Sequence, residues 1–222
     1  MPGEPYRQLP SGLVVCRTGP EHVHELEELQ RIVFPTLAAD ERFLARHYLR
    51  HIELFPEGQF CVVDPSLDRR VVGMTSTIRI DFDFDHPAHT FADVIQGGWL
   101  TSHQPAGRWL YGADIGTHPD YRRRGIARAL YAARHDTVHA LRLAGQLTVG
   151  MPSGYGAVAH EIAAEDYYAQ LVAGTRSDPT ISTQLRIGFE IRALVPSYIN
   201  DPVCAGYGIV LVLPADRDVR FP

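Results

Sequence analysis

Four arginines surround one glycine in the segment YRRRGIARAL, residues 121–130, of a chain whose formal charge is −5. Such a cluster has three ordinary explanations: a solvated helix start, a nucleic-acid patch, or a site that binds phosphate groups. A helix start exposes unpaired backbone N–H groups and the positive end of the helix dipole, and Gly125 permits close approach of the backbone. Arginine without an anion opposes that dipole, which disfavours the solvated start. The segment therefore predicts a diphosphate site.

The composition limits the classes of partner that we expect for this protein. The chain has 222 residues, of which 45% are apolar and 21% are charged, and these values predict a single globular domain over residues 1–222. Its acidity disfavours nucleic acid, because proteins that bind nucleic acid usually spread a basic excess over one face. No apolar run approaches the ~18 residues of a membrane span, and no secretory signal is evident. We expect a cytoplasmic protein without a membrane or nucleic-acid partner.

Cysteine and histidine do not predict a metal site. Cys16, Cys61 and Cys204 are odd in number, far apart and without CxxC spacing, so we expect buried free thiols. His47 and His51 share a helix face, but the sequence implies no third ligand.

The elements around the arginines place them at a strand-to-helix turn. Residues 108–119 alternate as a strand, residues 125–144 have helical apolar spacing, and residues 146–151 form the next strand. Short connections predict that the two strands are parallel neighbours. Before this unit we expect a strand at 12–19, helices at 20–34 and 40–55, strands at 60–64 and 69–81, and a short helix at 90–95. After it we expect a helix at 159–174 and strands at 189–199 and 206–213.

Arg122-x-x-Gly125-x-Ala127 at this turn is neither a Walker P-loop nor a Rossmann motif, since GxxxxGK[ST] and GxGxxG are both absent. The run IGTHPDYRRRGIARAL resembles the acetyl-coenzyme A motif of the GNAT acetyltransferase superfamily, with Ala127 replacing the commoner last glycine. The resemblance implies an α/β (α+β) fold: a mixed, mostly antiparallel sheet of about seven strands flanked by helices, in the element order given above.

The chain departs from many GNAT members in its last third. The stretch VAGTRSDPTISTQLRI lies between Tyr168 and Gly188-Phe189, where such members pass almost directly from helix to strand. This extended pattern resembles the GNAT domain that is joined to a carbon–nitrogen hydrolase domain in some two-part proteins. We therefore expect the acyltransferase part alone.

The resemblance also implies the chemistry and the donor site. It implies N-acetyl transfer from acetyl-coenzyme A to a primary amine of a small molecule or amino-acid-like acceptor, by direct attack. The implied pantetheine contacts are Ile115, Gly116 and Thr117. The implied pyrophosphate contacts are Arg122, Arg123, Arg124, Gly125, Ile126 and Ala127. A non-catalytic acyl-coenzyme A sensor or partner module is the alternative, and a homodimer through an exposed sheet edge is compatible with the fold.

Two side chains are candidates for proton transfer. Asp114, the only carboxylate on its strand, could act as a base through water, or it could face away from the cofactor if the strand alternates regularly. A bulge in the strand would change the face on which Asp114 lies. Tyr168 could donate a proton to the departing thiolate, Tyr167 competes for this role, and either tyrosine could simply pack.

Overall fold

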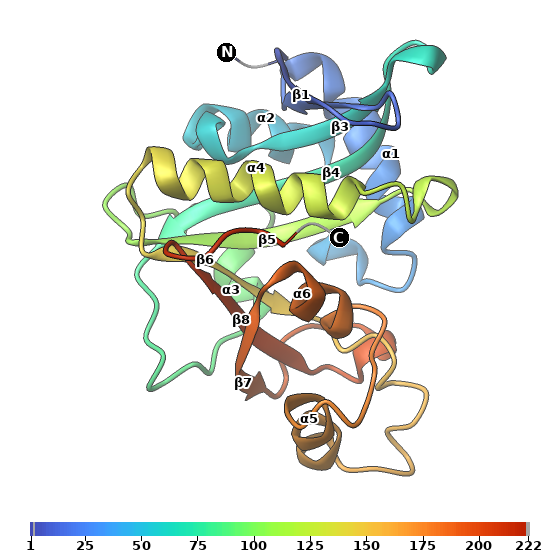
Figure 1. Cartoon of the computed structure of the whole chain (residues 1–222), viewed down its shortest axis with the longest axis vertical. Coiled ribbons are helices and arrows are strands. Elements are labelled where there is room, and N and C mark those ends of the chain that lie inside the picture. Colours follow the sequence, from blue (N-terminus) through green and yellow to red (C-terminus); the bar gives the residue numbers. More distant parts are fainter. Residues whose placement is uncertain (2, 221–222) are drawn as a thin grey trace.

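An eight-stranded sheet forms the centre of the computed structural model, which describes residue 1 and residues 3–220 (Figure 1). The strands are β1 (Pro5–Gln8), β2 (Val14–Arg17), β3 (Phe60–Asp64), β4 (Arg70–Ile80), β5 (Trp109–Thr117), β6 (Gly145–Gly150), β7 (Glu190–Val195) and β8 (Gly208–Pro214). Their order in the sheet is β1-β2-β3-β4-β5-β6-β8-β7, and all neighbours are antiparallel except β5 and β6. The predicted fold class is confirmed, with β1 as an additional strand. A homodimer through the β7 edge stays a prediction.

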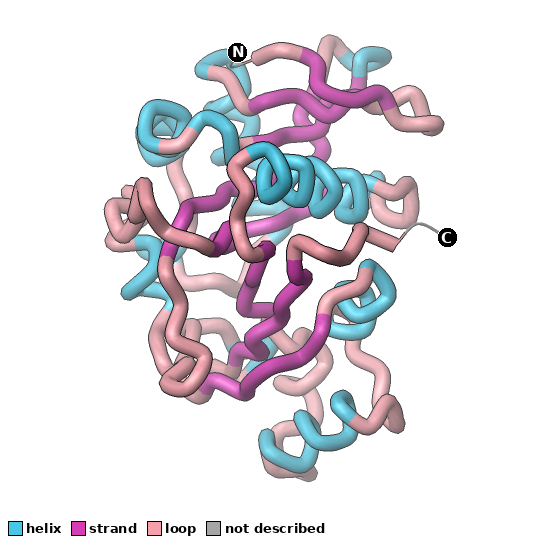
Figure 2. The backbone as a smooth tube through the Cα atoms, turned by 60° about the vertical axis from the view of Figure 1, so that its left-hand side comes forward, coloured by secondary structure: helices cyan, strands magenta, loops and turns pink. Residues whose placement is uncertain are grey.

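Helices cover both faces of this sheet (Figures 1 and 2). They are α1 (Val23–Val33), α2 (Ala45–Leu54), α3 (Phe91–Ile95), α4 (Ile126–Ala140), α5 (Ala164–Val172) and α6 (Ile181–Ile187). The α4 helix packs on one face against β3 to β6, and α1 packs on the other against β4 and β5. Both helices turn an apolar stripe toward the sheet, with Leu26 and Leu29 of α1 and Leu130 and Ala133 of α4 buried.

Several predicted boundaries move in the structure. The second helix begins at Ala45 rather than residue 40, because Asp40 lies in a separate 3₁₀ turn, Ala39–Glu41. The α4 helix ends at Ala140, and Gly145 starts β6 instead of terminating the helix. The main omission is α6, which lies in the extended segment before Gly188-Phe189.

Two irregularities of β5 shape the site. The pairing of β4 with β5 shifts between Ser76↔Asp114 and Thr77↔Gly112, so Ala113 is an extra, bulged residue. The parallel pairing of β5 with β6 covers only Trp109–Gly112 of β5 and ends there. Beyond Gly112 the two strands separate and no longer pair with each other.

Two predictions from composition can be compared with the described residues. Cys16, Cys61 and Cys204 are buried free thiols, as expected. Among residues 1 and 3–220, every helix is too short or too polar to cross a membrane.

Candidate active site

The arginine-rich turn joins β5 to α4 with unusual backbone angles. Arg123 has φ +61° and Gly125 has φ +82°, both in the left-handed region. Gly125 is the N-cap of α4, and no side chain caps the helix. The N–H groups of the first helical turn have no intrahelical acceptor, so the turn presents donors and the positive end of a 15-residue helix. This geometry suits an anion.

A cleft of about 470 Å³ lies over the turn. Its lining residues are Thr117, Tyr121, Arg122, Arg123, Gly125, Ile126, Ala127, Arg128, Thr183, Arg186 and Ile187. The Nε of Arg128 is buried without a hydrogen-bond partner. A buried, unpaired guanidinium donor is costly unless an anion satisfies it, so the residues present fit a pyrophosphate group.

Arg124 departs from its predicted place. Its guanidinium lies over the ring of Tyr121, 4.8 Å from the ring centroid, and Arg124 is absent from the cleft lining. The residues on either side of Arg124, Arg123 and Gly125, both have left-handed backbone angles, and the chain changes direction there. Arg128 and Arg186, which were not predicted, take part in the cleft in its place.

Two smaller cavities continue from this cleft along β5. The first, about 130 Å³, is lined by Ile115, Gly116 and Thr117, and it shares Thr117, Ala127 and Thr183 with the cleft. The second, also about 130 Å³, contains Asp114 and shares Ile115, Thr180 and Gln184 with the first. The three cavities form one track from the α4 N-terminus to Asp114, and the predicted strand residues line it.

Asp114 faces the α1 and α2 side of the sheet, opposite to Ile115 and Thr117, as regular alternation predicts. The Ala113 bulge breaks the alternation only before Asp114, so Gly112 faces α4. One carboxylate oxygen accepts from the backbone N–H of Ser76, and the other accepts from Gln30 Nε2 at 2.7 Å and Tyr48 OH at 3.4 Å. Burial raises the pKa of Asp114 to about 6, although the Ser76 hydrogen bond opposes the shift. The carboxylate is therefore a stronger base than an exposed one.

The Asp114 cavity is otherwise mostly apolar. Its apolar lining consists of Phe34, Leu37, Phe43, Phe91, Ala113, Ile115, Val149, Met151 and Ile199. Glu41 is a second carboxylate in the lining, and it accepts from the backbone N–H of Asn200 at 3.2 Å. Burial raises the pKa of Glu41. Tyr198 supplies a phenol to the same wall.

The structure does not bring Tyr168 to this cavity. Tyr168 lies on α5, half-buried against an apolar cluster that includes Tyr155 and Leu171, and it is not in the lining. Its neighbour Tyr167 donates to Asp178 Oδ2 at 2.8 Å and is part of the packing. The inserted segment carries α5 away from β5, and α6 takes the place beside the track (Figure 1).

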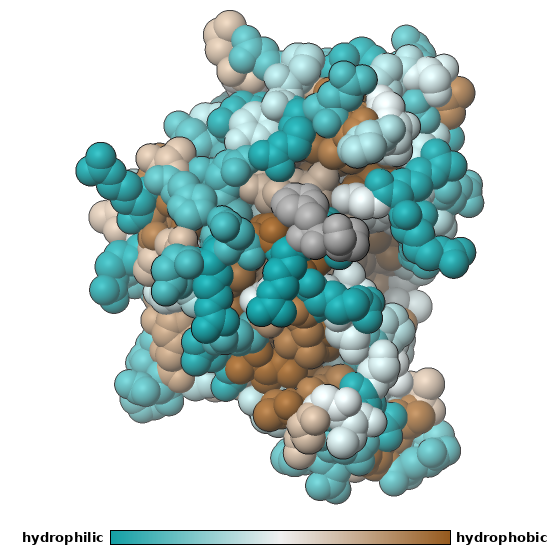
Figure 3. Space-filling model, viewed as in Figure 1, coloured by the Kyte–Doolittle hydropathy of each residue, from teal (hydrophilic) through white to brown (hydrophobic). Residues whose placement is uncertain are grey.

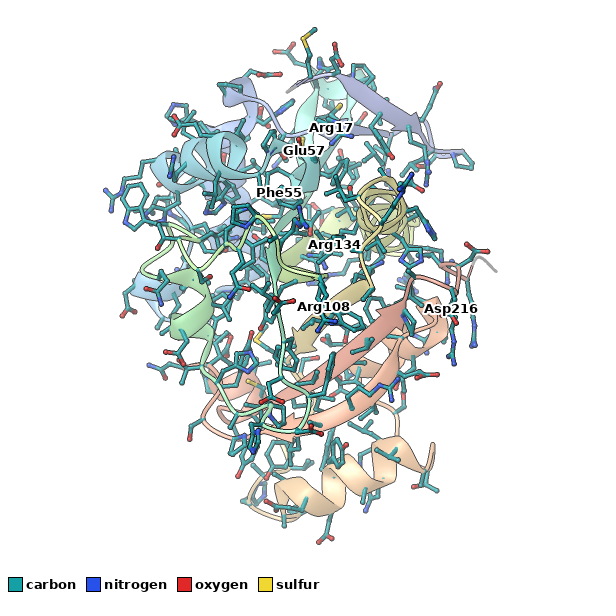
Figure 4. All side chains as sticks on the ribbon, turned by 90° about the vertical axis from the view of Figure 1, so that its left-hand side faces the viewer. Arg17, Phe55, Glu57, Arg108, Arg134 and Asp216 are labelled. Atoms are coloured by element: carbon teal, nitrogen blue, oxygen red, sulfur yellow. The ribbon has the colours of Figure 1, made fainter. Side chains whose placement is uncertain are left out.

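Arg134 of α4 lies where β5 and β6 separate. Its guanidinium donates to the backbone carbonyl of Asp114, and a Cβ built on Gly112 would lie 2.2 Å from its Nη1. Arg134 is 1% exposed, between α4 and the sheet (Figure 4). Thr75 Oγ1 donates to the same Asp114 carbonyl at 2.8 Å. Side chains thus satisfy a group that would otherwise bond to a neighbouring strand.

The residues that sequence reasoning missed come largely from α6. Thr180, Thr183 and Gln184 line the track from this helix. A signal was available in the dipeptide Asp178-Pro179, since Asp178 Oδ1 accepts from the N–H groups of Thr180 and Ile181 at 2.9 and 3.0 Å. Aspartate before proline is typical of a helix start.

Comparisons with known proteins place this geometry in a family. The profile of the acetyltransferase (GNAT) family matches residues 23–150. A probable hydrolase, YhcX of Bacillus subtilis, is 32% identical over 189 residues, which are 85% of this chain and 36% of that protein. An uncharacterized N-acetyltransferase of the same organism, YkwB, is 31% identical over 190 residues, which are 85% of this chain and 83% of that protein. This chain thus spans about a third of the first relative and most of the second.

Solved structures agree on the fold. The loading GNATL domain of CurA from Lyngbya majuscula has a TM-score of 0.74 at 18% identity, covering 91% of this chain and 98% of that one. The GphF GNAT-like decarboxylase in complex with isobutyryl-CoA has a TM-score of 0.73 at 19% identity, covering 90% and 98%. The family profile and the similarity to YkwB over most of its length are decisive. The chain belongs to the acetyltransferase (GNAT) family, whose acyl donor is acetyl-coenzyme A.

Proposed function

We propose that the enzyme acetylates a primary amine of a small molecule or amino-acid-like acceptor, with Asp114 as the base. The single observation that carries this proposal is the position of Asp114, at the inner end of a track that starts at the anion-binding turn. An amine must lose its proton before it attacks a thioester. A carboxylate with a pKa of about 6 remains ionised at neutral pH and binds a proton more strongly than an ordinary aspartate.

The donor would be held by the parts of the site that lie along the track. The turn amides and the arginines of the cleft would bind its pyrophosphate, and the β5 segment Ile115 to Thr117 would face its pantetheine arm. Acetyl-coenzyme A supplies the activated acetyl group when bound, while the protein positions the two reactants and accepts a proton.

The cavity around Asp114 favours a cationic acceptor with an apolar body. Glu41 and Asp114 are carboxylates that would attract an ammonium group, and aromatic side chains from Phe34, Phe43 and Phe91 surround the remaining space. Cysteine, serine and histidine do not occur among the described residues that line this cavity. This lining supports direct attack rather than a covalent acyl-enzyme.

Thiol release in the presence of a panel of primary amines tests the proposal. We expect 2-phenylethylamine and other amines with an apolar body to be acetylated faster than alcohols of the same shape, with the amide product identified by mass spectrometry. Calorimetric titration with acetyl-coenzyme A provides the independent measurement of donor binding. Micromolar donor binding without acetylation of any amine would favour the sensor alternative.

A further inference from the structure

A row of three side chains connects the Asp114 cavity with a second cavity at the protein surface. His89 Nε2 lies 3.0 Å from Tyr111 OH, and Tyr111 OH lies 2.9 Å from Tyr198 OH. Tyr198 lines the Asp114 cavity, whereas the half-buried His89 lines an open cavity of about 250 Å³. Tyr111, on β5, is 0% exposed. The hydrogen bonds therefore form a continuous path through the protein interior.

The contacts of His89 give this path a direction. His89 Nδ1 lies 2.7 Å from the carbonyl oxygen of Pro87, which can only accept, so Nδ1 carries a hydrogen. A neutral imidazole has one N–H, and Nε2 is then an acceptor. Tyr111 must donate to Nε2 and accept from Tyr198. With His89 neutral, both hydroxyl hydrogens point from the cavity toward the surface.

We propose that Tyr198, Tyr111 and His89 carry the proton released by the acceptor amine out of the cavity. This inference rests on the proposed function, because converting an ammonium and a thioester into an amide and a thiol releases one proton. Asp114 takes the proton from the ammonium and passes it to cavity water; when Tyr198 takes up a proton from that water, its own proton passes to Tyr111. The proton of Tyr111 passes to His89 Nε2. Each tyrosine gains one proton and loses one, and His89 becomes an imidazolium.

Titratable side chains surround both ends of this hydrogen-bonded path. Near His89, the surface cavity contains one further histidine and three carboxylates: His86, Asp81, Asp83 and Asp93. Phe82 and Tyr198 pack edge-on against the His89 ring. At the inner end lie Asp114 and Glu41, with Tyr48 bonded to Asp114. His89 lines the open cavity, where the imidazolium releases a proton to water and the ring then returns to its Nδ1–H form.

Nitrogen NMR of histidine-labelled free protein tests the direction without any turnover. We expect the neutral form of His89, assigned by the loss of its signals in His89→Gln, to carry its hydrogen on Nδ1. We also expect Tyr111→Phe, which removes the donor to Nε2, to change the His89 shifts, and Tyr155→Phe to leave them unchanged. Tyr155 is a matched buried tyrosine that bonds to the carbonyl of Ile162 at 3.3 Å. A hydrogen on Nε2 of neutral His89 would overturn the proposal.

Kinetics with acetyl-coenzyme A and 2-phenylethylamine test the transfer itself. We expect Tyr111→Phe and His89→Gln to lower kcat about tenfold, a modest share of what positioned proton transfer contributes, with both KM values within about twofold. Their kcat should rise with buffer concentration, since buffer bases replace the path, while the wild-type value should not. His86→Gln, in the same surface cavity, is the control for His89→Gln.

The failure of this inference can be told apart from the failure of the proposed function. Wild-type enzyme that acetylates no amine would overturn both. Wild-type turnover with kcat unchanged in Tyr111→Phe and in His89→Gln would overturn the relay alone. The His89 variant keeps the test decisive if loss of the buried Tyr111 hydroxyl prevents folding.

Discussion

The two ends of the track are built in opposite ways. The turn end is formed mainly by residues 121–128, with Thr183, Arg186 and Ile187 of α6 on its other side, and it carries arginines. The Asp114 end contains two carboxylates and takes its walls from α1, α3, β5, β6, α6 and the loop after β7. Most of a donor site that consists of backbone amides and arginines can be specified by one short sequence motif. An acceptor site requires the whole chain to fold first.

This contrast predicts that chemistry and donor binding can be separated by substitution. Asp114→Asn has the largest expected effect, a kcat lowered by about a hundredfold or more, because the base is lost. The dissociation constant for acetyl-coenzyme A should stay within about twofold, as measured by calorimetry. Asp166→Asn, on the exposed side of α5, is a suitable control. Retention of kcat in Asp114→Asn would remove Asp114 from the mechanism.

The pH dependence of kcat also separates the chemical step from donor binding. Asp114 acts as a base only when ionised, and its pKa is raised to about 6. We expect wild-type kcat to fall about tenfold per unit as pH drops below about 6 and to level off above it. Donor affinity, measured over the same range, should not follow this curve. The residual activity of Asp114→Asn should lack the step at about pH 6.

At the turn end, Arg128→Gln should weaken acetyl-coenzyme A binding about tenfold, because a charged hydrogen-bond donor to an anion is lost. Its kcat at saturating donor should be nearly unchanged. Arg124→Gln is a matched control within the same motif, since its guanidinium lies over Tyr121. Equal losses from both substitutions would mean that net charge, rather than the cleft geometry, holds the donor.

Glu41→Gln should have the smallest effect of these substitutions. Glu41 attracts the ammonium group without taking the proton, so we expect a KM for 2-phenylethylamine raised about threefold to tenfold. The KM for acetyl-coenzyme A should not change. A matched rise in both values would indicate a structural role for the Asn200 contact instead.

These opposite constructions also explain how far the sequence could predict the site. The turn from Arg122 to Ala127 and the strand residues Ile115 to Thr117 could be predicted because they lie in a local motif, and all of them except Arg124 line the track. Their contacts with the donor stay a prediction. Asp114 lies opposite to Ile115 by regular alternation, which was one of the two alternatives, whereas the Ala113 bulge that separates it from Gly112 depends on β4 pairing and no local pattern marks it. The structure places Tyr168 and Tyr167 outside the Asp114 cavity, and the sequence alone does not fix this because the position of α5 depends on tertiary packing. The seven-residue α6 is too short for a clear period, so Gln184 went unnoticed.

An apolar surface lies between α5 and α6, where the inserted segment packs (Figure 3). Both helices pack on a cluster that includes Ile181, Leu171 and Tyr167, and Asp178 bonds to Tyr167 and to the N–H of Gly154. The insertion is therefore anchored on an apolar cluster that it shares with α4 and β8.

The buried Arg134 contacts β5 just beyond the end of its pairing with β6. Its guanidinium occupies the space that the missing side chain of Gly112 leaves, at the point where β5 and β6 part. Pairing of β6 with the Asp114 carbonyl would have to replace its bond to the buried Arg134 guanidinium. The opening for the donor therefore exists before the donor arrives, and binding does not have to break a strand pair. A rigid gap of this kind lowers the reorganisation cost of every catalytic cycle.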